Sequence, residues 1–249
     1  MLRLLRRLRG GIEPIDPVRW QAARTALPWL RPLAADDDAA LQALTARFLA
    51  RKTITALDGL QLDYGQCLQL AALCCLPPLR FGAEGLHGWS QLLVYPQAFR
   101  VGRSHVDAAG VLHQWDDELI GEAWDAGPVI LSWADVQADI ADPGAGCCVA
   151  VHEMAHKLDV LDGVLDGTPP LPRAWQREWA RDFQQAFDAL VRRVERGGRS
   201  AIDPYAAEAP EEFFAVCSEY HFSAPAILQR AMPKVADHLQ RFYGPPPLS

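Results

Sequence analysis

Hydrophobic residues recur at three- and four-residue intervals in the first third of the chain and again after residue 133, which is typical of amphipathic helices. One such face carries five large apolar side chains: Trp175, Trp179, Phe183, Phe187 and Leu190. The pattern predicts helices over residues 16–27, 36–49, 64–76, 134–140, 147–158, 174–195, 210–222 and 225–242. Prolines or glycines lie at the ends of most of these segments, where helices commonly start or stop.

The middle of the chain has short apolar runs between turn residues, a pattern typical of β-strands. It predicts strands over residues 54–57, 92–95, 99–101, 111–113 and 129–133. The strand over residues 129–133 is the clearest. It could lie at an exposed edge of the sheet, where a peptide could bind, or in the interior of the sheet. The order of helices, strands and helices predicts an α+β fold. No low-complexity linker divides the 249 residues, so we expect a single domain over residues 1–249.

Charge and composition narrow the range of partners. The net charge of −7 argues against a nucleic-acid partner, because phosphate backbones are bound by a concentrated basic surface. No run of about 18 apolar residues occurs, so we expect no stable membrane insertion. None of the six cysteines forms a C-x-x-C pair, and we expect free thiols in a cytoplasmic protein. Residues 1–11 place four arginines among leucines, and we expect a mobile basic segment there.

The most informative motif is His152-Glu153-Met154-Ala155-His156, inside the predicted helix over residues 147–158. Two histidines four positions apart lie on one helical face, so both rings can bind a single ion. Glu153 projects beside that ion, where a carboxylate can take a proton from water. Imidazole and carboxylate ligands suit one zinc ion (Zn²⁺), and a three-ligand site leaves a fourth position for water. The apolar flanks predict a buried helix, in which these polar groups need partners.

A third protein ligand is needed, because two histidines do not complete a catalytic zinc site. One arrangement places it six residues after the second histidine, here Asp162, but Asp159 then stands where that arrangement has a glycine. Another arrangement takes a glutamate from a later helix, here the one predicted over residues 210–222. Glu212 and Glu219 share a face of that helix. Spacing alone leaves four glutamates open: Glu208, Glu211, Glu212 and Glu219.

These motifs resemble the Mlc titration factor A family of bacterial zinc peptidases. The similarity rests on the stretch from His152 to Asp159, on Tyr205-Ala206-Ala207, and on Pro210-x-Glu212-x-Phe214-Ala215-Val216-x-Ser218-Glu219-Tyr220, and it extends over about residues 26–243. The resemblance implies a zincin-like domain, with a small mixed sheet and an active-site helix, whose metal site is similar to that of the anthrax lethal factor catalytic domain. It implies that His152, His156 and Glu212 bind zinc and that Glu153 is the general base.

Three further residues have two interpretations each. The resemblance points to Tyr205 as a site residue, where a phenol can donate a hydrogen bond to an oxyanion. The alternative for Tyr205 is packing beside Pro204. For Asp159 and Glu219, one interpretation is an acceptor that orients a metal-bound histidine. The other is an ordinary contact at a helix end or in a loop.

Two functions are compatible with these residues. The first is a zinc-dependent peptidase that hydrolyses peptide bonds in a peptide or protein substrate, in an aminopeptidase-like manner. The second is a protein that sequesters a transcriptional repressor, because binding of the repressor Mlc is a second role in the family that this sequence resembles. Glu153 favours the enzyme, since a purely structural zinc site has closed coordination and no general base.

Overall fold

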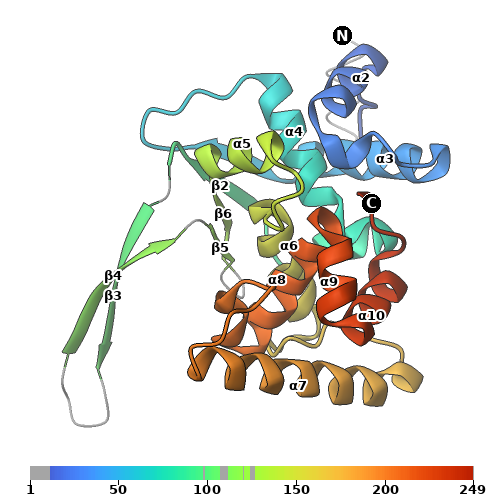
Figure 1. Ribbon diagram of the computed structural model, residues 1–249. Helices are drawn as coiled ribbons and strands as arrows, with labels where there is room; N and C mark the ends of the chain where they lie inside the picture. The colour runs from blue at the N-terminus through green and yellow to red at the C-terminus, as the bar shows by residue number, and fades with distance from the viewer. Residues whose placement is uncertain (1–11, 98, 107–111, 120, 124–126, 249) are drawn as a thin grey trace.

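The computed structural model describes residues 12–97, 99–106, 112–119, 121–123 and 127–248 (Figure 1). The predicted mobile segment over residues 1–11 lies outside the described residues. Helices precede and follow the strands along the chain, so the predicted α+β class is confirmed. Short 3₁₀ helices join several of the elements: η1 (Pro28–Leu30), η2 (Pro77–Arg80), η3 (Gly82–Leu86), η4 (Val160–Asp162) and η5 (Pro204–Ala207).

The first third of the chain forms α2 (Pro17–Ala26), α3 (Ala35–Arg51), β1 (Thr53–Ala56) and α4 (Tyr64–Cys75). Local capping explains where α2 and α4 begin. Asp16 Oδ1 accepts hydrogen bonds of 3.1 Å from the first N–H groups of α2. At α4, Asp63 and Gln66 exchange two hydrogen bonds of 2.8 Å, which is a capping box.

A four-stranded sheet has the strand order β1–β2–β6–β5. The strands β1, β2 (Gln91–Tyr95) and β6 (Val129–Ser132) run parallel, and β5 (Gly121–Ala123) pairs antiparallel with β6. All four residues of β6 are buried, and the strand has a neighbour on each side. The interpretation of the 129–133 segment as an exposed edge is therefore wrong. Among the described strands the edge beside it is β5, which the apolar pattern did not predict.

A second, two-stranded sheet projects from the body of the molecule (Figure 1). It consists of β3 (Phe99–Val106) and β4 (Leu112–Leu119), paired antiparallel from Phe99 opposite Leu119 to Val106 opposite Leu112. Both strands were predicted, at about the right place but much shorter. Polar residues occupy most positions of the two strands, so the apolar runs marked only part of each.

The rest of the chain is helical: α5 (Trp133–Ala141), α6 (Val149–Asp159), α7 (Arg173–Glu195), α8 (Pro210–Ser223), α9 (Pro225–Ala231) and α10 (Pro233–Tyr243). The single helix predicted over residues 225–242 is two helices. Pro233 has no N–H to continue the helix, and it disfavours the helical conformation in the residue before it. Met232 accordingly leaves the helical region, with φ −142° and ψ 68°.

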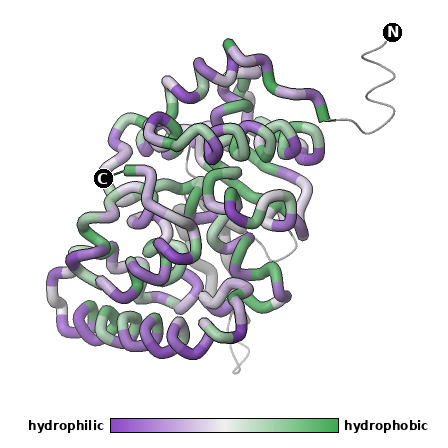
Figure 2. The backbone as a smooth tube through the Cα atoms, turned by 90° about the vertical axis from the view of Figure 1, so that its right-hand side faces the viewer, coloured by the Kyte–Doolittle hydropathy of each residue, from purple (hydrophilic) through white to green (hydrophobic). Residues whose placement is uncertain are grey.

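The core joins both helical parts to the sheet and is continuous among the described residues. The long helix α7 packs its aromatic face inward, with Trp179 fully buried and its ring stacked on Phe183 at 3.9 Å between centroids. Figure 2 shows α7 along the lower edge, mostly hydrophilic with hydrophobic positions at intervals, as the periodicity predicted. The six cysteines are free. No helix in the described part of the chain is long and apolar enough to span a membrane.

Candidate metal centre

The helix α6 passes through the core, and every residue in it except His152 is buried. Carboxylates from two other helices satisfy the N–H groups at its start. Cys148 N–H donates to Glu219 Oε2 at 2.6 Å, and Val149 N–H donates to Asp139 Oδ2 at 2.8 Å. Negative charge at a helix N-terminus is favourable, because unpaired N–H groups and the helix dipole both point there. These contacts fix the position of the helix that carries the histidines.

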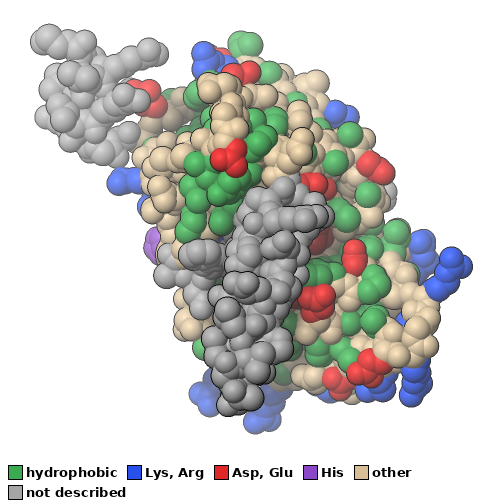
Figure 3. Space-filling model, turned by 90° about the vertical axis from the view of Figure 1, so that its left-hand side faces the viewer, with side chains coloured by type: hydrophobic (Ala, Val, Ile, Leu, Met, Phe, Trp, Pro, Cys, Tyr) green, Lys and Arg blue, Asp and Glu red, His purple; other side chains and the backbone are tan. Residues whose placement is uncertain are grey.

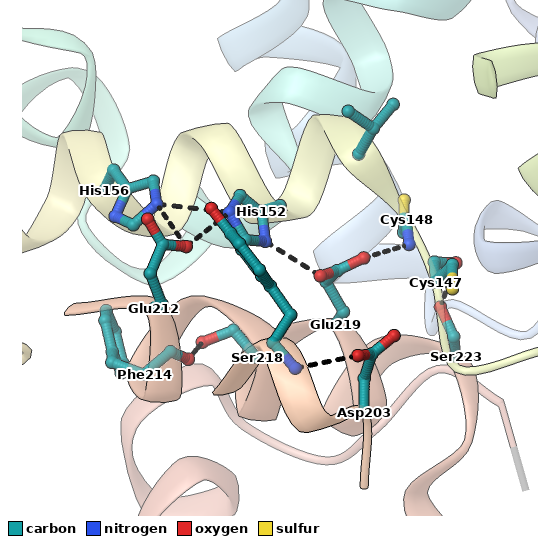
Figure 4. A network of polar contacts seen from close by, with 12 residues as sticks. Cys147, Cys148, His152, His156, Asp203, Glu212, Phe214, Ser218, Glu219 and Ser223 are labelled. Carbon is teal, nitrogen blue, oxygen red and sulfur yellow. Dashed lines mark hydrogen bonds and ion pairs between the residues drawn. The ribbon is translucent and has the colours of Figure 1, made fainter. Parts of the chain in front are cut away.

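Three side chains from α6 and α8 converge at one point (Figure 4). The Nε2 atoms of His152 and His156 are 3.2 Å apart. Glu212, in the first turn of α8, places its Oε2 3.1 Å from Nε2 of His152 and 3.4 Å from Nε2 of His156. Atoms that carry lone pairs can approach this closely only with a proton or a cation between them.

A metal ion fits this donor set. Neutral imidazole nitrogens and a carboxylate oxygen are ligands that zinc accepts, and the three candidate ligand atoms lie within 4.8 Å of one another. His152, His156 and Glu212 are the residues that could hold a metal ion in the part of the chain that the structure describes. Of the four glutamates that spacing left open, the structure brings Glu212 to both histidines.

The electrostatics also favour a cation. Burial lowers the pKa of His152, but hydrogen bonds to Glu212 and Glu219 outweigh it and leave that pKa well above its ordinary value. Burial lowers the pKa of His156 below its ordinary value, although Glu212 opposes this. Burial raises the pKa of Glu212, yet hydrogen bonds from the two histidines hold it far below the usual range. Two carboxylates thus surround two imidazoles, and positive charge is stabilised between them.

Glu219 reaches the outer nitrogen of His152. Its Oε1 lies 2.8 Å from His152 Nδ1, while Oε2 accepts the bond from Cys148 already described. A carboxylate that accepts from one ring nitrogen keeps that nitrogen protonated and leaves the other free to bind a metal. The position matches the ring-orienting interpretation of Glu219.

Asp159 lies at the end of α6 and faces a loop. Its Oδ2 accepts a 2.7 Å hydrogen bond from Gly167 N–H, and among the described residues Asp159 forms no hydrogen bond or ion pair with either histidine ring. Burial raises the pKa of Asp159 to about 7. The position matches the loop-contact interpretation, and not that of a carboxylate that orients a metal-bound histidine.

The loop held by Asp159 packs directly on the start of α8. Gly167 has φ +79°, and a Cβ atom there would lie 2.3 Å from the carbonyl oxygen of Pro210, the first residue of α8. Only glycine allows this approach. Through this contact the end of α6 fixes the first turn of α8, from which Glu212 projects.

Tyr205 lies at the mouth of the site. It is 39% exposed, in η5, and its ring centroid is 6.1 Å from that of His152. Its N–H donates to Asp203 Oδ1 at 2.9 Å, an Asx turn that starts η5. Burial, the charge of Glu212 and a hydrogen bond to that carboxylate raise the pKa of Tyr205, so the phenol stays protonated. Asp203-Pro204 repeats the cap-and-proline signature of Asp16-Pro17 and could have revealed η5.

The structure also places two further residues that the sequence analysis considered, Glu153 and Asp162. Glu153 is buried on α6. Burial raises the pKa of the nearby Cys74 thiol to about 12, and the charge of Glu153 adds to this shift. Asp162 is exposed in η4, where it accepts from Val164 N–H and does not join the histidines. Asp139 was not predicted as a site residue. It accepts from Val149 N–H at the start of α6, but it belongs to α5, and no local spacing relates the two helices.

The chain is similar to known proteins over most of its length. Residues 2–244 match the family described as glucose-regulated metallo-peptidase M90. The chain is 38% identical over 239 residues to Mlc titration factor A of Cronobacter sakazakii, covering 94% of this chain and 88% of that protein. It is 37% identical over 236 residues to Mlc titration factor A of Escherichia fergusonii, with the same coverage. Family and relatives agree with the resemblance of the motifs, and the chain belongs to the glucose-regulated metallo-peptidase M90 family.

Proposed function

We propose that this protein is a zinc-dependent peptidase, with His152, His156 and Glu212 as zinc ligands and Glu153 as general base. The observation that carries the proposal is the convergence of three lone-pair atoms within 4.8 Å, together with the buried Glu153, whose charge contributes to raising the pKa of His152. The family supplies the coarser part, a metallo-peptidase and hence a metal. Zinc is the choice that suits two imidazoles and one carboxylate.

The residues of the chain divide the work of hydrolysis. When bound, zinc supplies a Lewis acid that lowers the pKa of a water molecule towards about 7. With the metal in place, Glu153 would take a proton from the attacking water and later deliver it to the leaving amine. Tyr205, protonated at the mouth of the site, donates a hydrogen bond to the oxyanion that develops on the substrate carbonyl. Glu219 holds the ring of His152 in the orientation that binds the metal.

Two observations support a peptide substrate. The edge strand β5 packs against α6, so an extended peptide could add to the sheet there through backbone hydrogen bonds. For an aminopeptidase-like mode, a carboxylate must bind the free amino group of the substrate. Glu208 and Glu211 are close enough to the site to influence the pKa of Tyr205 and His156, respectively.

The decisive test is the Glu153→Gln variant. Wild type and variant are purified with zinc, their zinc content is measured, and both are assayed against aminoacyl substrates and against peptides with blocked N-termini. We expect equal zinc content, hydrolysis by the wild type, and loss of at least about a hundredfold in kcat for the variant, because general-base catalysis contributes that much or more. Glu178→Gln on the outer face of α7 is the matched control and should retain full activity.

The competing function is sequestration of a transcriptional repressor. It is favoured by one observation, the name Mlc titration factor A shared by the relatives. A purified repressor that binds wild type and Glu153→Gln equally, while neither hydrolyses any substrate, would support sequestration over catalysis.

A further inference from the structure

A cavity of about 570 Å³ lies outside the metal centre, and neither proposed function uses it. Its walls are the second half of α7, the 200–202 segment and the junction between α9 and α10. Ligand sites for small molecules commonly have volumes of about 300–1,000 Å³. The size of this cavity therefore suits a small molecule.

The floor of the cavity is apolar and buried. Leu190, Ile202 and Val235 are 3%, 1% and 1% exposed, and all three line the space. Ala186 and Met232 extend this apolar surface. A ligand that fills the cavity would therefore place an apolar or aromatic body against the floor.

The rim is positively charged. Arg193, Arg230 and Lys234 line the cavity, and Asp182 is the one acidic residue among its described lining residues. Within the described chain, neither Arg193 nor Arg230 forms an ion pair, and the hydrogen bond of Arg193 goes to the backbone carbonyl of Arg199 at 3.4 Å. Two arginines on an open rim are thus available to a ligand.

The charge of Asp182 is already compensated inside the protein. Its carboxylate accepts from Arg181 at 2.8 and 2.9 Å, from Lys234 at 3.0 Å and from His238 at 3.1 Å. It therefore does not repel an anion in the way a free carboxylate does.

The positive charge continues along the end of α7. An adjoining cavity of about 320 Å³ shares Arg193 and adds Arg192 and Arg196. Figure 3 shows lysine and arginine side chains along the lower edge of the molecule, where α7 runs in Figure 1, with acidic side chains among them. In a chain whose net charge is −7, this concentration defines a local anion-attracting surface.

We propose that the cavity between α7 and the α9–α10 junction binds a small organic anion, a carboxylate or phosphate ester with an apolar or aromatic body. The arginines pair with the anionic group, because guanidinium matches carboxylate and phosphate oxygens in two parallel hydrogen bonds. The buried floor receives the apolar body. A small molecule fits better than a protein segment, because a volume of about 570 Å³ lies in the range of small-molecule sites.

One wall of the cavity is continuous along the chain with a segment of the candidate metal centre. Ser200, Ala201 and Ile202 form one wall and run directly into Asp203 and η5, which carries Tyr205. The residues of this wall are only a few positions before Tyr205, whose side chain forms a hydrogen bond with Glu212. The binding proposal itself does not depend on peptidase activity.

The test is calorimetric titration of the zinc-loaded protein with phenyl phosphate. We expect a dissociation constant of about 1 mM or tighter. Inorganic phosphate and benzyl alcohol should each bind more weakly, because each lacks one half of the interaction. The double variant Arg193→Gln/Arg230→Gln should weaken binding about tenfold or more. Ala189→Phe, which places a ring into both cavities, should block it. Arg177→Gln, exposed on α7 outside the cavity, is the control and should bind as the wild type does.

Three results would overturn the proposal. Unchanged binding by the double variant would place the phosphate ester elsewhere, including at the metal. If benzyl alcohol bound as tightly as phenyl phosphate, the arginines would have no role in recognising the anionic group. Binding of an acidic peptide without binding of phenyl phosphate would identify a protein-docking surface instead. None of these readings involves hydrolysis, so failure here is distinguishable from failure of the peptidase proposal.

Discussion

Two groups of histidine and carboxylate lie buried or partly buried in the described part of the chain, and they differ in which of their atoms already have hydrogen-bond partners. At the metal centre, two imidazole nitrogens and a carboxylate oxygen point at one another. Around Asp182, each acceptor faces a donor instead. Trp175 Nε1 donates to His238 Nδ1 at 2.8 Å, and Nε2 of the same ring lies 3.1 Å from Asp182.

The difference shows that burial of histidine and acid is not enough for a metal site. The Asp182 group has no lone pairs left to share, because Arg181 and Lys234 occupy the remaining positions on its carboxylate. The group at α6 and α8 is incomplete without a proton or a cation. The former is therefore expected to stabilise the fold, and the latter to bind metal.

The largest expected effect is at Glu212, the proposed third ligand. Glu212→Gln removes the charged ligand and should lower zinc affinity by more than about a hundredfold, since even outer-shell partners cost 10–100-fold. Competition with a chelating dye measures the change. The neighbouring Glu211→Gln is the control, and an equal loss there would mean that general negative charge and not direct ligation holds the ion.

A smaller effect is expected behind His152. Glu219→Gln keeps only one acceptor oxygen. That oxygen can accept a hydrogen bond from His152 Nδ1 or from Cys148 N–H, whereas the two carboxylate oxygens of Glu219 accept both. Zinc affinity should fall about 10–100-fold, with both histidines and Glu212 still present. The same chelator competition measures it. Unaltered affinity would assign Glu219 to the start of α6 alone.

At the second group we expect a change in stability and not in metal content. Asp182→Asn should lower the free energy of unfolding by about 1–3 kcal/mol, measured by urea denaturation, with zinc content unchanged. The donors around Asp182 depress its pKa, so its contribution is present above the ordinary aspartate pKa of about 4 and is lost as the pH falls below it. Asp237→Asn, exposed on α10, is the control. A loss of zinc in Asp182→Asn would break the distinction between the two groups.

The smallest effect concerns Asp139. Burial raises its pKa to about 7, with Glu219 and Asp135 adding to the shift, although the bond from Val149 N–H opposes it. A raised pKa means that the stability contribution is complete below about pH 4 and is lost as the pH rises through 7. Asp139→Asn keeps an acceptor for Val149 but carries no charge. Relative to the wild type, its melting temperature should therefore rise between pH 5 and pH 8.5; a constant difference would contradict the shift.

The helices and the metal helix were predictable because their signals are local. Asp16-Pro17, the aromatic face of α7 and the His152–His156 spacing each specify a geometry within a few turns. The short strand β5 was not predictable, since Gly121-Glu122-Ala123 has no apolar run and pairs only because β6 lies beside it.

Residue spacing likewise could not distinguish Glu212 from the other three candidate glutamates. It depends on α8 lying along α6, a packing that no local pattern encodes. The Asp182–His238 pair was missed for the same reason, because its members come from α7 and α10, 56 positions apart. Resemblance to a family supplied the glutamate that physical reasoning alone had left open.

The contact between Gly167 and Pro210 determines which amino-acid substitutions this loop can tolerate. Any side chain at 167 would collide with the backbone that starts α8, so the position should tolerate change as poorly as a ligand, although it touches no metal. Gly163 also has a positive φ, +94°, but nothing within 4 Å would meet its Cβ, so asparagine is acceptable there. Selection for activity across a library of variants would thus fix one glycine of the loop and leave the other free to vary.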